Sequence, residues 1–163
     1  MDTHSALVAA KNDWLHQQVE VDYPTKESLK GRELYFSRYN STQLFDYDQI
    51  SASANFIAEN IFKVDFHRLT VMFSLLQSTL WPASDDQELI VEFLSQIIYA
   101  APCDLYLAFE QGTPVAAAIV TCVEGRGLIS DIATHVDIDK HGFVVSLAEV
   151  LAESGVEVQE VEL

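Results

Sequence analysis

The feature that most constrains the fold of this chain is a change in hydrophobic spacing at Pro102. Between residues 51 and 101, large apolar residues recur every three or four positions, which is the spacing of amphipathic helices. After Pro102, segment 104–110 alternates between apolar and polar residues, a turn follows, and 114–124 is almost continuously apolar. Alternation indicates a half-buried strand, and a bounded apolar run indicates a buried one. The sequence therefore predicts three helices before Pro102 and a β-hairpin after it.

The rest of the second half extends this pattern. Residues 128–134 follow a Gly-Arg-Gly turn and predict a third strand, while 143–153 has the apolar spacing of a helix that Gly155 would end. Residues 156–163 predict a last strand. Because a helix separates the last two strands, we expect them to be parallel and joined by a crossover.

The first part of the chain gives a weaker pattern. Segment 5–18 has helical spacing, residues 19–32 indicate a connection, and the aromatic segment 33–39 predicts a strand. We expect an N-terminal helix and connection in residues 1–32 and one domain in 33–163, since compact domains most often contain about 100–150 residues. The predicted fold is α/β (α+β), with helices on both faces of a mixed central sheet built from 33–39, 104–110, 114–124, 128–134 and 156–163.

The charge of the chain excludes one class of partner. The sequence has 9 Lys and Arg against 25 Asp and Glu, a formal net charge of −16. A nucleic-acid-binding protein needs a basic surface to neutralise phosphates, so we expect no nucleic-acid partner. The acidity is concentrated in residues 83–163, where Arg126 and Lys140 are the only bases. Such a surface keeps a protein soluble or attracts a cationic substrate, and the sequence leaves both open.

No segment indicates export or a membrane. The start of the chain lacks the basic and apolar regions of a secretory signal, and the apolar run 114–123 is shorter than the roughly 20 residues that span a bilayer. Cys103 and Cys122 lie in or beside apolar runs without metal-binding spacing, so we expect reduced core cysteines. These features predict a cytoplasmic protein with no membrane partner.

Residues 104–163 resemble the central part of the Gcn5-related N-acetyltransferase (GNAT) superfamily. The likeness lies in the order hairpin, strand, loop, helix and strand, and in the segment 131–144, DIATHVDIDKHGFV. In that superfamily the strand backbone holds the pantetheine arm of acetyl-CoA, and a glycine-containing loop binds its pyrophosphate at the positive end of a helix. The resemblance implies an acetyltransferase-like fold with acetyl-CoA as cofactor, bound by Ile132, Thr134, Gly142, Phe143 and Val144. Lys140 and His141 are candidates to bind the anionic cofactor in place of the Arg or Gln of the family, and a pair of exposed loop residues is the alternative interpretation.

This chain also departs from the family pattern. Gly142 stands at the first glycine of the loop, but Asp139 replaces the usual Arg or Gln and Val144 replaces the second small residue. The sequence stops at Leu163, before the helix and two strands that usually follow in the family. Two functions stay open. One is an acyl-CoA-dependent N-acyltransferase for a cationic amine, active or inactive. The other is a non-catalytic interaction or dimerisation module whose uncovered last strand accepts another strand, either from a second subunit, giving a homodimer, or from the N-terminal extension.

Asp131 is the candidate catalytic residue. It lies within a predicted strand among apolar neighbours, where burial would raise the pKa of its carboxyl toward that of a useful general base. In a transferase, Asp131 or a water would take the proton of the amine, and the strand backbone near Ile132 would donate to the thioester oxygen. The same position is also typical of a hydrogen-bonded structural aspartate, and the sequence leaves this open.

Two further groups of residues have both a functional and a structural interpretation. Residues at alternate positions, with Asp131 four residues before the first, would present metal ligands on one side of an extended chain: His135, Asp137, Asp139 and His141. A polar loop before a helix gives the same pattern, and we predict no metal. An aromatic segment with Arg38 indicates either a ligand pocket or core packing; its aromatic residues are Tyr35, Tyr39, Phe45 and Tyr47.

Overall fold

The hairpin expected after Pro102 forms the centre of the sheet. The computed structural model describes residues 5–39, 42–50 and 60–163. The strands are β1 (Leu44–Asp46), β2 (Ile61–Lys63), β3 (Cys103–Glu110), β4 (Thr113–Val123), β5 (Arg126–Thr134) and β6 (Glu157–Glu162). The helices are α1 (Ala6–His16), α2 (Lys26–Tyr39), α3 (His67–Ser78), α4 (Ser84–Leu94) and α5 (Lys140–Glu153), with 3-10 turns η1 (Gln17–Val19) and η2 (Tyr47–Gln49).

These strands form a mixed sheet in the order β1-β6-β5-β4-β3-β2. All neighbouring pairs are antiparallel except β5 and β6, which are parallel and joined through α5. Gly155, which follows α5, has a φ of +86°, so it ends the helix in the left-handed conformation that glycine adopts without a steric penalty. The predicted hairpin, parallel crossover and α/β fold class are confirmed.

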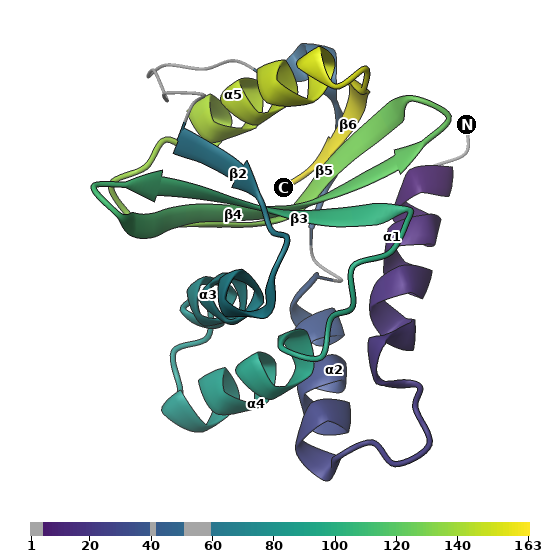
Figure 1. Cartoon of the computed structure of the whole chain (residues 1–163), viewed down its shortest axis with the longest axis vertical. Helices are drawn as coiled ribbons and strands as arrows, with labels where there is room; N and C mark the ends of the chain where they lie inside the picture. The colour runs from purple at the N-terminus through teal and green to yellow at the C-terminus, as the bar shows by residue number, and fades with distance from the viewer. Residues whose placement is uncertain (1–4, 40–41, 51–59) are drawn as a thin grey trace.

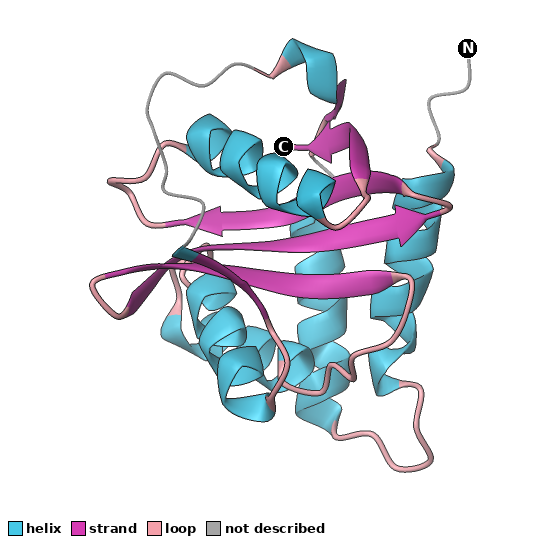
Figure 2. Cartoon of the chain, turned by 45° about the horizontal axis from the view of Figure 1, so that its top comes forward, coloured by secondary structure: helices cyan, strands magenta, loops and turns pink. Residues whose placement is uncertain are grey.

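Helices cover both faces of the sheet (Figures 1 and 2). Helices α1 to α4 lie on one face and α5 lies on the other. Alternation along β3 gives each face its own core, because Leu105 and Leu107 pack with the four helices while Tyr106 and Ala108 pack on the side of α5. The sheet is therefore buried on both faces, which explains the nearly continuous apolar sequence of β4.

The strand predicted at residues 33–39 is wrong, because these residues form the second half of α2. Ser28, Gly31 and Tyr35 are the buried residues of this helix, and they recur at helical spacing. Gly31 allows close packing: a Cβ at this position would lie 2.0 Å from the carbonyl oxygen of Leu89 in α4. The connection predicted at 19–32 is likewise wrong from Lys26 onward, where α2 begins.

The region before Pro102 is only partly helical. Helices α3 and α4 are confirmed, and the predicted core residue Phe73 is fully buried. The first of the three expected helices falls largely on residues 51–59, which lie outside the described residues, and Ile61 belongs to strand β2 rather than to a helix. The aromatic and branched residues of β2 pair with β3 and extend the sheet on that side.

The predicted uncovered edge beside β6 is also wrong. Strand β1 pairs with β6 along Leu44, Phe45 and Asp46, and the backbone groups of Gln43 and Leu163 exchange two further hydrogen bonds of 2.7 and 2.8 Å. The chain therefore supplies its own neighbour for β6. Both outer strands of the described sheet, β1 and β2, have only three residues, which limits the open hydrogen-bonding edge.

Helix α1 is built into the fold. Ser5 caps it, since its hydroxyl accepts hydrogen bonds from the backbone N–H groups of Leu7 and Val8. Trp14 and Leu15 are 7% and 0% exposed and belong to the core beneath the sheet. Burying such side chains stabilises a fold by about 1.5–3 kcal/mol each.

Candidate functional site

A bulge in β5 places Asp131 beneath the sheet. Ala117 of β4 pairs with Ala133 and Ile119 pairs with Ser130, so Asp131 and Ile132 together stand opposite one residue of β4. Asp131 has a φ of +53°, which an aspartate tolerates better than most residues but still at a cost of about 1–3 kcal/mol. A bulge re-aims side chains, and this one turns Asp131 toward α1 and α2 while Ile132 packs on the side of α5.

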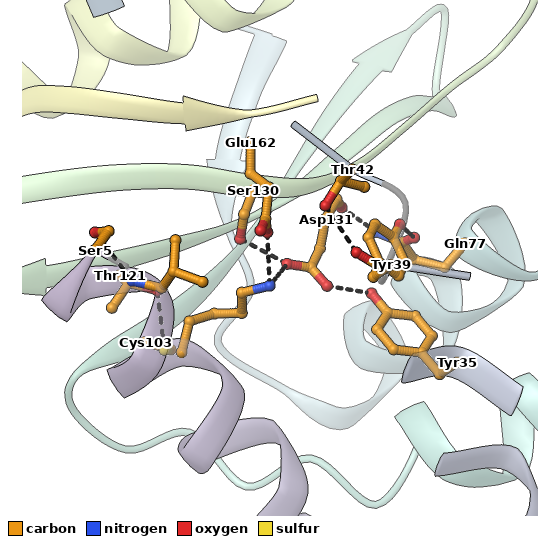
Figure 3. Close-up of polar contacts among 12 residues, drawn as sticks. Ser5, Tyr35, Tyr39, Thr42, Gln77, Cys103, Thr121, Ser130, Asp131 and Glu162 are labelled. Carbon is orange, nitrogen blue, oxygen red and sulfur yellow. Dashed lines mark hydrogen bonds and ion pairs between the residues drawn. The ribbon is translucent and has the colours of Figure 1, made fainter. Parts of the chain in front are cut away.

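The carboxylate of Asp131 lies in a buried polar network. Its partners include Lys11 of α1, as well as Tyr35 and Ser130, which are labelled beside it in Figure 3. Nζ of Lys11 lies 2.9 Å from Oδ1 of Asp131 and 2.8 Å from Oε1 of Glu162. The side chains of Lys11, Asp131 and Glu162 are only 1%, 0% and 11% exposed. One ammonium therefore joins two carboxylates from β5 and β6, which fixes α1 to both strands.

Helices α2 and α3 complete this network. The hydroxyl of Tyr35 donates to Oδ2 of Asp131 at 2.7 Å, and the hydroxyl of Ser130 donates to Oδ1 at 2.6 Å. The side-chain amide of Gln77 donates to the backbone carbonyl of Asp131, and its oxygen accepts a 3.1 Å hydrogen bond from Tyr39. Both carboxylate oxygens of Asp131 have polar partners, and side chains from α1, α2 and α3 hold the bulge in place.

The surroundings shift the pKa values of the network in defined directions. Burial alone would lower the pKa of Lys11, but the charges and hydrogen bonds of Asp131 and Glu162 outweigh it, and the pKa is raised above the ordinary 10.5. Burial, reinforced by the negative charge of Asp131, raises the pKa of Tyr35 and of Tyr39 above the ordinary 10. At neutral pH Lys11 is therefore charged and both tyrosines are neutral.

A cavity lies beside this network, where the two parallel strands separate. Pairing between β5 and β6 ends at Ile129 and Val161, although β5 continues to Thr134. The cavity, which we call the β5–β6 cavity, has a volume of about 140 Å³. Its lining combines two cationic, one anionic, two hydroxyl and three apolar residues: Arg38, Lys140, Glu162, Tyr39, Thr42, Leu80, Ile132 and Leu163. In open α/β sheets, ligands bind outside the carboxyl ends of parallel strands, which is the position of this cavity.

Larger depressions lie elsewhere on the surface. One of about 600 Å³ runs along α1 and α2 and includes Arg32, whose Nη1 contacts Oε1 of Glu20 at 2.7 Å. Another of about 430 Å³ lies beside the start of α1 and contains Asp46, Glu124 and Glu160. Neither touches the buried network, so volume alone does not identify the site.

The cofactor residues expected from the GNAT resemblance are divided between the cavity and the core. Ile132 and Lys140 line the cavity, and Thr134 ends β5 half-buried. Phe143 and Val144 are fully buried and pack in the core between the sheet and α5. The remaining two, His141 and Gly142, lie in the first turn of α5, half-buried and buried.

The alternating polar segment does not continue as a strand. β5 ends at Thr134 and α5 begins at Lys140, so the residues between them form a loop. In this loop, Nδ1 of His135 lies 3.6 Å from Oδ2 of Asp137. Over the described parts of the chain, no three His, Cys, Asp or Glu side chains are grouped as metal ligands. Cys103 and Cys122 are free, and burial raises the pKa of Cys103 to about 12.

Sequence reasoning missed half of the site. Lys11 stood among polar residues in a weakly amphipathic helix, and Glu162 stood in an alternating acidic strand. One signal was present: in a chain with net charge −16, a lysine on the apolar side of α1 needs carboxylate partners. Within the aromatic segment, Arg38 and Tyr39 line the cavity, whereas Tyr35 is fully buried in the core.

The residues present do not fit acetyl-CoA. Pockets that hold drug-sized ligands have about 300–1,000 Å³, whereas the β5–β6 cavity has about 140 Å³. Asp139 is the N-cap of α5 and puts a carboxylate beside the amides that a pyrophosphate would use. The side chain of Val144 is fully buried, so this position gives a pyrophosphate no exposed small-residue surface.

Comparisons with known proteins find a likeness in structure but none in sequence. No protein-family model matches the chain, and no curated protein matches it. Among solved structures, an acetyltransferase of the GNAT family from Novosphingobium aromaticivorans aligns with a TM-score of 0.43 and 12% sequence identity, over 75% of this chain and 50% of that chain. The present chain thus matches half the length of that neighbour. In the part of the chain that the structure describes, no helix is long and apolar enough to cross a membrane.

Proposed function

We propose that this chain is a non-catalytic binding domain that takes a compact anionic ligand, of the carboxylate class, into the β5–β6 cavity. The observation that carries the proposal is that two cationic residues, Arg38 and Lys140, line a small cavity in a protein of net charge −16. Cations gathered in an acidic protein create a local site for an anion. The guanidinium of Arg38 also offers the planar pair of donors that matches a carboxylate.

The size of the cavity sets the size of the ligand. A cavity of about 150 Å³ holds a benzene-sized molecule, and the β5–β6 cavity has about 140 Å³. A ligand of about six non-hydrogen atoms therefore fits, which is the size of a short carboxylic acid.

The buried network supports binding rather than catalysis. A general base must come within hydrogen-bonding distance of the proton it takes. The carboxylate of Asp131 is 0% exposed, and its two oxygens already contact Lys11, Ser130 and Tyr35. In this proposal Asp131 holds the bulge in β5 and, through Lys11, fixes Glu162 at the wall of the cavity.

A second candidate is an acyl-CoA-dependent N-acyltransferase acting on a cationic amine. The position of the cavity favours it, because Ile132 of β5 and Lys140 at the start of α5 both line the cavity. Those are two of the positions that the GNAT resemblance implies for acetyl-CoA. This function requires α1 or α2 to move so that the cavity enlarges and a substrate reaches Asp131.

Thermal unfolding at constant ionic strength separates the two functions. Acetate and acetyl-CoA are titrated in parallel, since a ligand at a hundred times its Kd adds about 2.7 kcal/mol of stability. We expect acetate to raise the Tm to a plateau and acetyl-CoA to leave it unchanged. Replacing Arg38 by Gln should remove the acetate effect, while Lys26→Gln, at the exposed start of the same helix, should keep it.

The opposite pattern supports the transferase. A plateau with acetyl-CoA at micromolar concentration that disappears in Lys140→Glu would replace our proposal by the second candidate. Release of free CoA in the presence of a polyamine would then establish turnover. No plateau with either ligand contradicts both functions.

A further inference from the structure

The chemistry of the β5–β6 cavity identifies its ligand more narrowly than charge alone. We infer that the cavity takes a short carboxylic acid bearing a hydrogen-bond donor on the carbon next to the carboxylate, either a hydroxyl or an ammonium group. This inference rests on the proposed binding function. It comes from the presence of one carboxylate, Glu162, in a cavity lined by two cations.

Glu162 gives the cavity a negatively charged hydrogen-bond acceptor. A ligand whose only polar group is a carboxylate has no donor for this acceptor. Its Oε1 contacts Nζ of Lys11 at 2.8 Å, and this ion pair fixes the position of the Glu162 side chain. A carboxylate has two oxygens and several lone pairs, so Oε2 can still accept a hydrogen bond from a ligand. A ligand without a donor would bring its own negative charge near Glu162 and desolvate it without compensation.

The cationic side of the cavity fixes the other end of the ligand. Arg38 and Lys140, which are both exposed, come from α2 and α5, whereas Glu162 comes from β6, so residues of opposite charge line the cavity from different elements. A carboxylate that pairs with Arg38 and Lys140 leaves the neighbouring carbon to present its substituent to Glu162. A simple amine is disfavoured, because the two cations repel it.

The remaining wall is apolar and small. Leu80, Ile132 and Leu163 give room for a short hydrocarbon group rather than for a further charge. Lactate and alanine each have six non-hydrogen atoms, which is the benzene-sized limit set above. Propionate has the same skeleton without the donor and is therefore the matched control ligand.

The charges around the cavity distinguish the hydroxyl from the ammonium form. Among the residues that line the cavity, Arg38 and Lys140 oppose Glu162, which leaves one positive charge on the lining. A hydroxy acid with one negative charge neutralises it, whereas a zwitterionic amino acid leaves it unchanged. We therefore expect lactate to bind more tightly than alanine.

The test is a titration of the full chain followed through backbone amide NMR signals. Lactate, alanine and propionate are compared at constant ionic strength and pH 7. We expect saturable shifts at Thr42, Ile132 and Leu163, with propionate at least about tenfold weaker than lactate, because a hydrogen bond to a charged group contributes about 1.5–3 kcal/mol. Arg38→Gln should weaken lactate about tenfold or more, and Lys26→Gln should leave its Kd unchanged.

Three other outcomes of the titration would overturn the inference, and one of them would also overturn the proposed function. Equal affinity for propionate and lactate overturns this inference and keeps the binding of compact carboxylates. Saturable shifts confined to residues outside the cavity overturn the inference as well. Absence of saturation by all three acids at tens of millimolar overturns both the inference and the proposed function.

Discussion

At the scale of the residue, Lys11 is the charge on which the site depends. It is 1% exposed and joins two carboxylates on different strands. A buried ion pair adds little stability compared with apolar residues in place of all its members. Removing one member alone is costly, because it leaves an uncompensated buried charge. The role of Lys11 is therefore positional: it orients Asp131 and Glu162 and connects α1 to the cavity wall.

Substituting Lys11 with Met should destabilise the protein strongly. We expect the free energy of unfolding at pH 7 to fall by about 3–5 kcal/mol, since two buried carboxylates lose their cation. Urea unfolding measures the loss. The exposed Lys26→Met should change stability by no more than about 0.5 kcal/mol.

A triple variant tests the cause. Adding Asp131→Asn and Glu162→Gln to Lys11→Met removes the uncompensated charges and should recover a large part of the lost stability. If Lys11→Met alone costs less than about 1 kcal/mol, the network does not hold the site as described.

The same residues predict a loss of stability in alkali. The folded-state pKa of Lys11 is raised, so the stability it contributes is complete below about pH 10.5 and is lost as the pH rises through the folded value. The pKa values of Tyr35 and Tyr39 are also raised, so above about pH 10 the unfolded chain releases protons that the folded chain retains. All three effects favour unfolding as the pH rises.

Urea unfolding at pH 8, 9, 10 and 11 measures this trend. We expect little change up to pH 9 and a steep fall above pH 10, to which each group adds at most about 1.4 kcal/mol per pH unit. Tyr35→Phe should lower stability at neutral pH by about 1–3 kcal/mol, because Asp131 loses a donor, and should flatten the alkaline fall. An unchanged alkaline slope in this variant would argue against a buried neutral Tyr35.

At the scale of the element, α2 shows why local sequence was misleading. The aromatic residues of ELYFSRY favour a strand by propensity, yet Tyr35 and Tyr39 recur at helical spacing, with their ring centroids 4.7 Å apart in a tilted contact. Tertiary contact decides the outcome, because Tyr35 lies against Trp81 and Phe93, from distant parts of the chain. By contrast, the hairpin, β5, α5 and β6 carry patterns in which local propensity and burial agree, so the sequence predicted them correctly.

Gly31 gives a direct test of the packing of α2. In an exposed helix, Gly→Ala usually stabilises by about 0.5–1 kcal/mol. A Cβ at Gly31 would lie 2.0 Å from the carbonyl oxygen of Leu89 and 2.8 Å from Cβ of Phe93. We therefore expect Gly31→Ala to destabilise by about 1–3 kcal/mol in urea unfolding, with the exposed Ser37→Ala near neutral. A stabilised Gly31→Ala variant would mean that α2 and α4 lie farther apart than described.

The bulge in β5 lies beyond what an alternating pattern can predict. Regular alternation would send Ser130 and Asp131 to opposite faces, but the hydroxyl of Ser130 donates to the carboxylate of Asp131. Sequence therefore identified Asp131 as an important residue without its partners. Those partners come from α1, α2 and α3, and their convergence depends on the whole fold.

At the scale of the whole molecule, the distribution of charge determines which ligand the protein admits. Four of the nine Lys and Arg residues lie in α2, and Arg38 near its end lines the cavity together with Lys140 of α5. The acidic remainder of the surface repels large polyanions, while the cavity attracts a small anion. Higher salt should therefore weaken carboxylate binding, since the attraction of rim charges is screened. Titrations of lactate at two ionic strengths check this, and an affinity that rises with salt would contradict it.

The most direct test of the central claim is a calorimetric titration of the same protein sample with lactate and with acetyl-CoA at matched ionic strength. The account predicts one saturable site for lactate and no saturable heat for acetyl-CoA up to millimolar concentration. Tight binding of acetyl-CoA, with lactate giving only dilution heat, would contradict the account and identify the β5–β6 cavity as the closed entrance of a cofactor site.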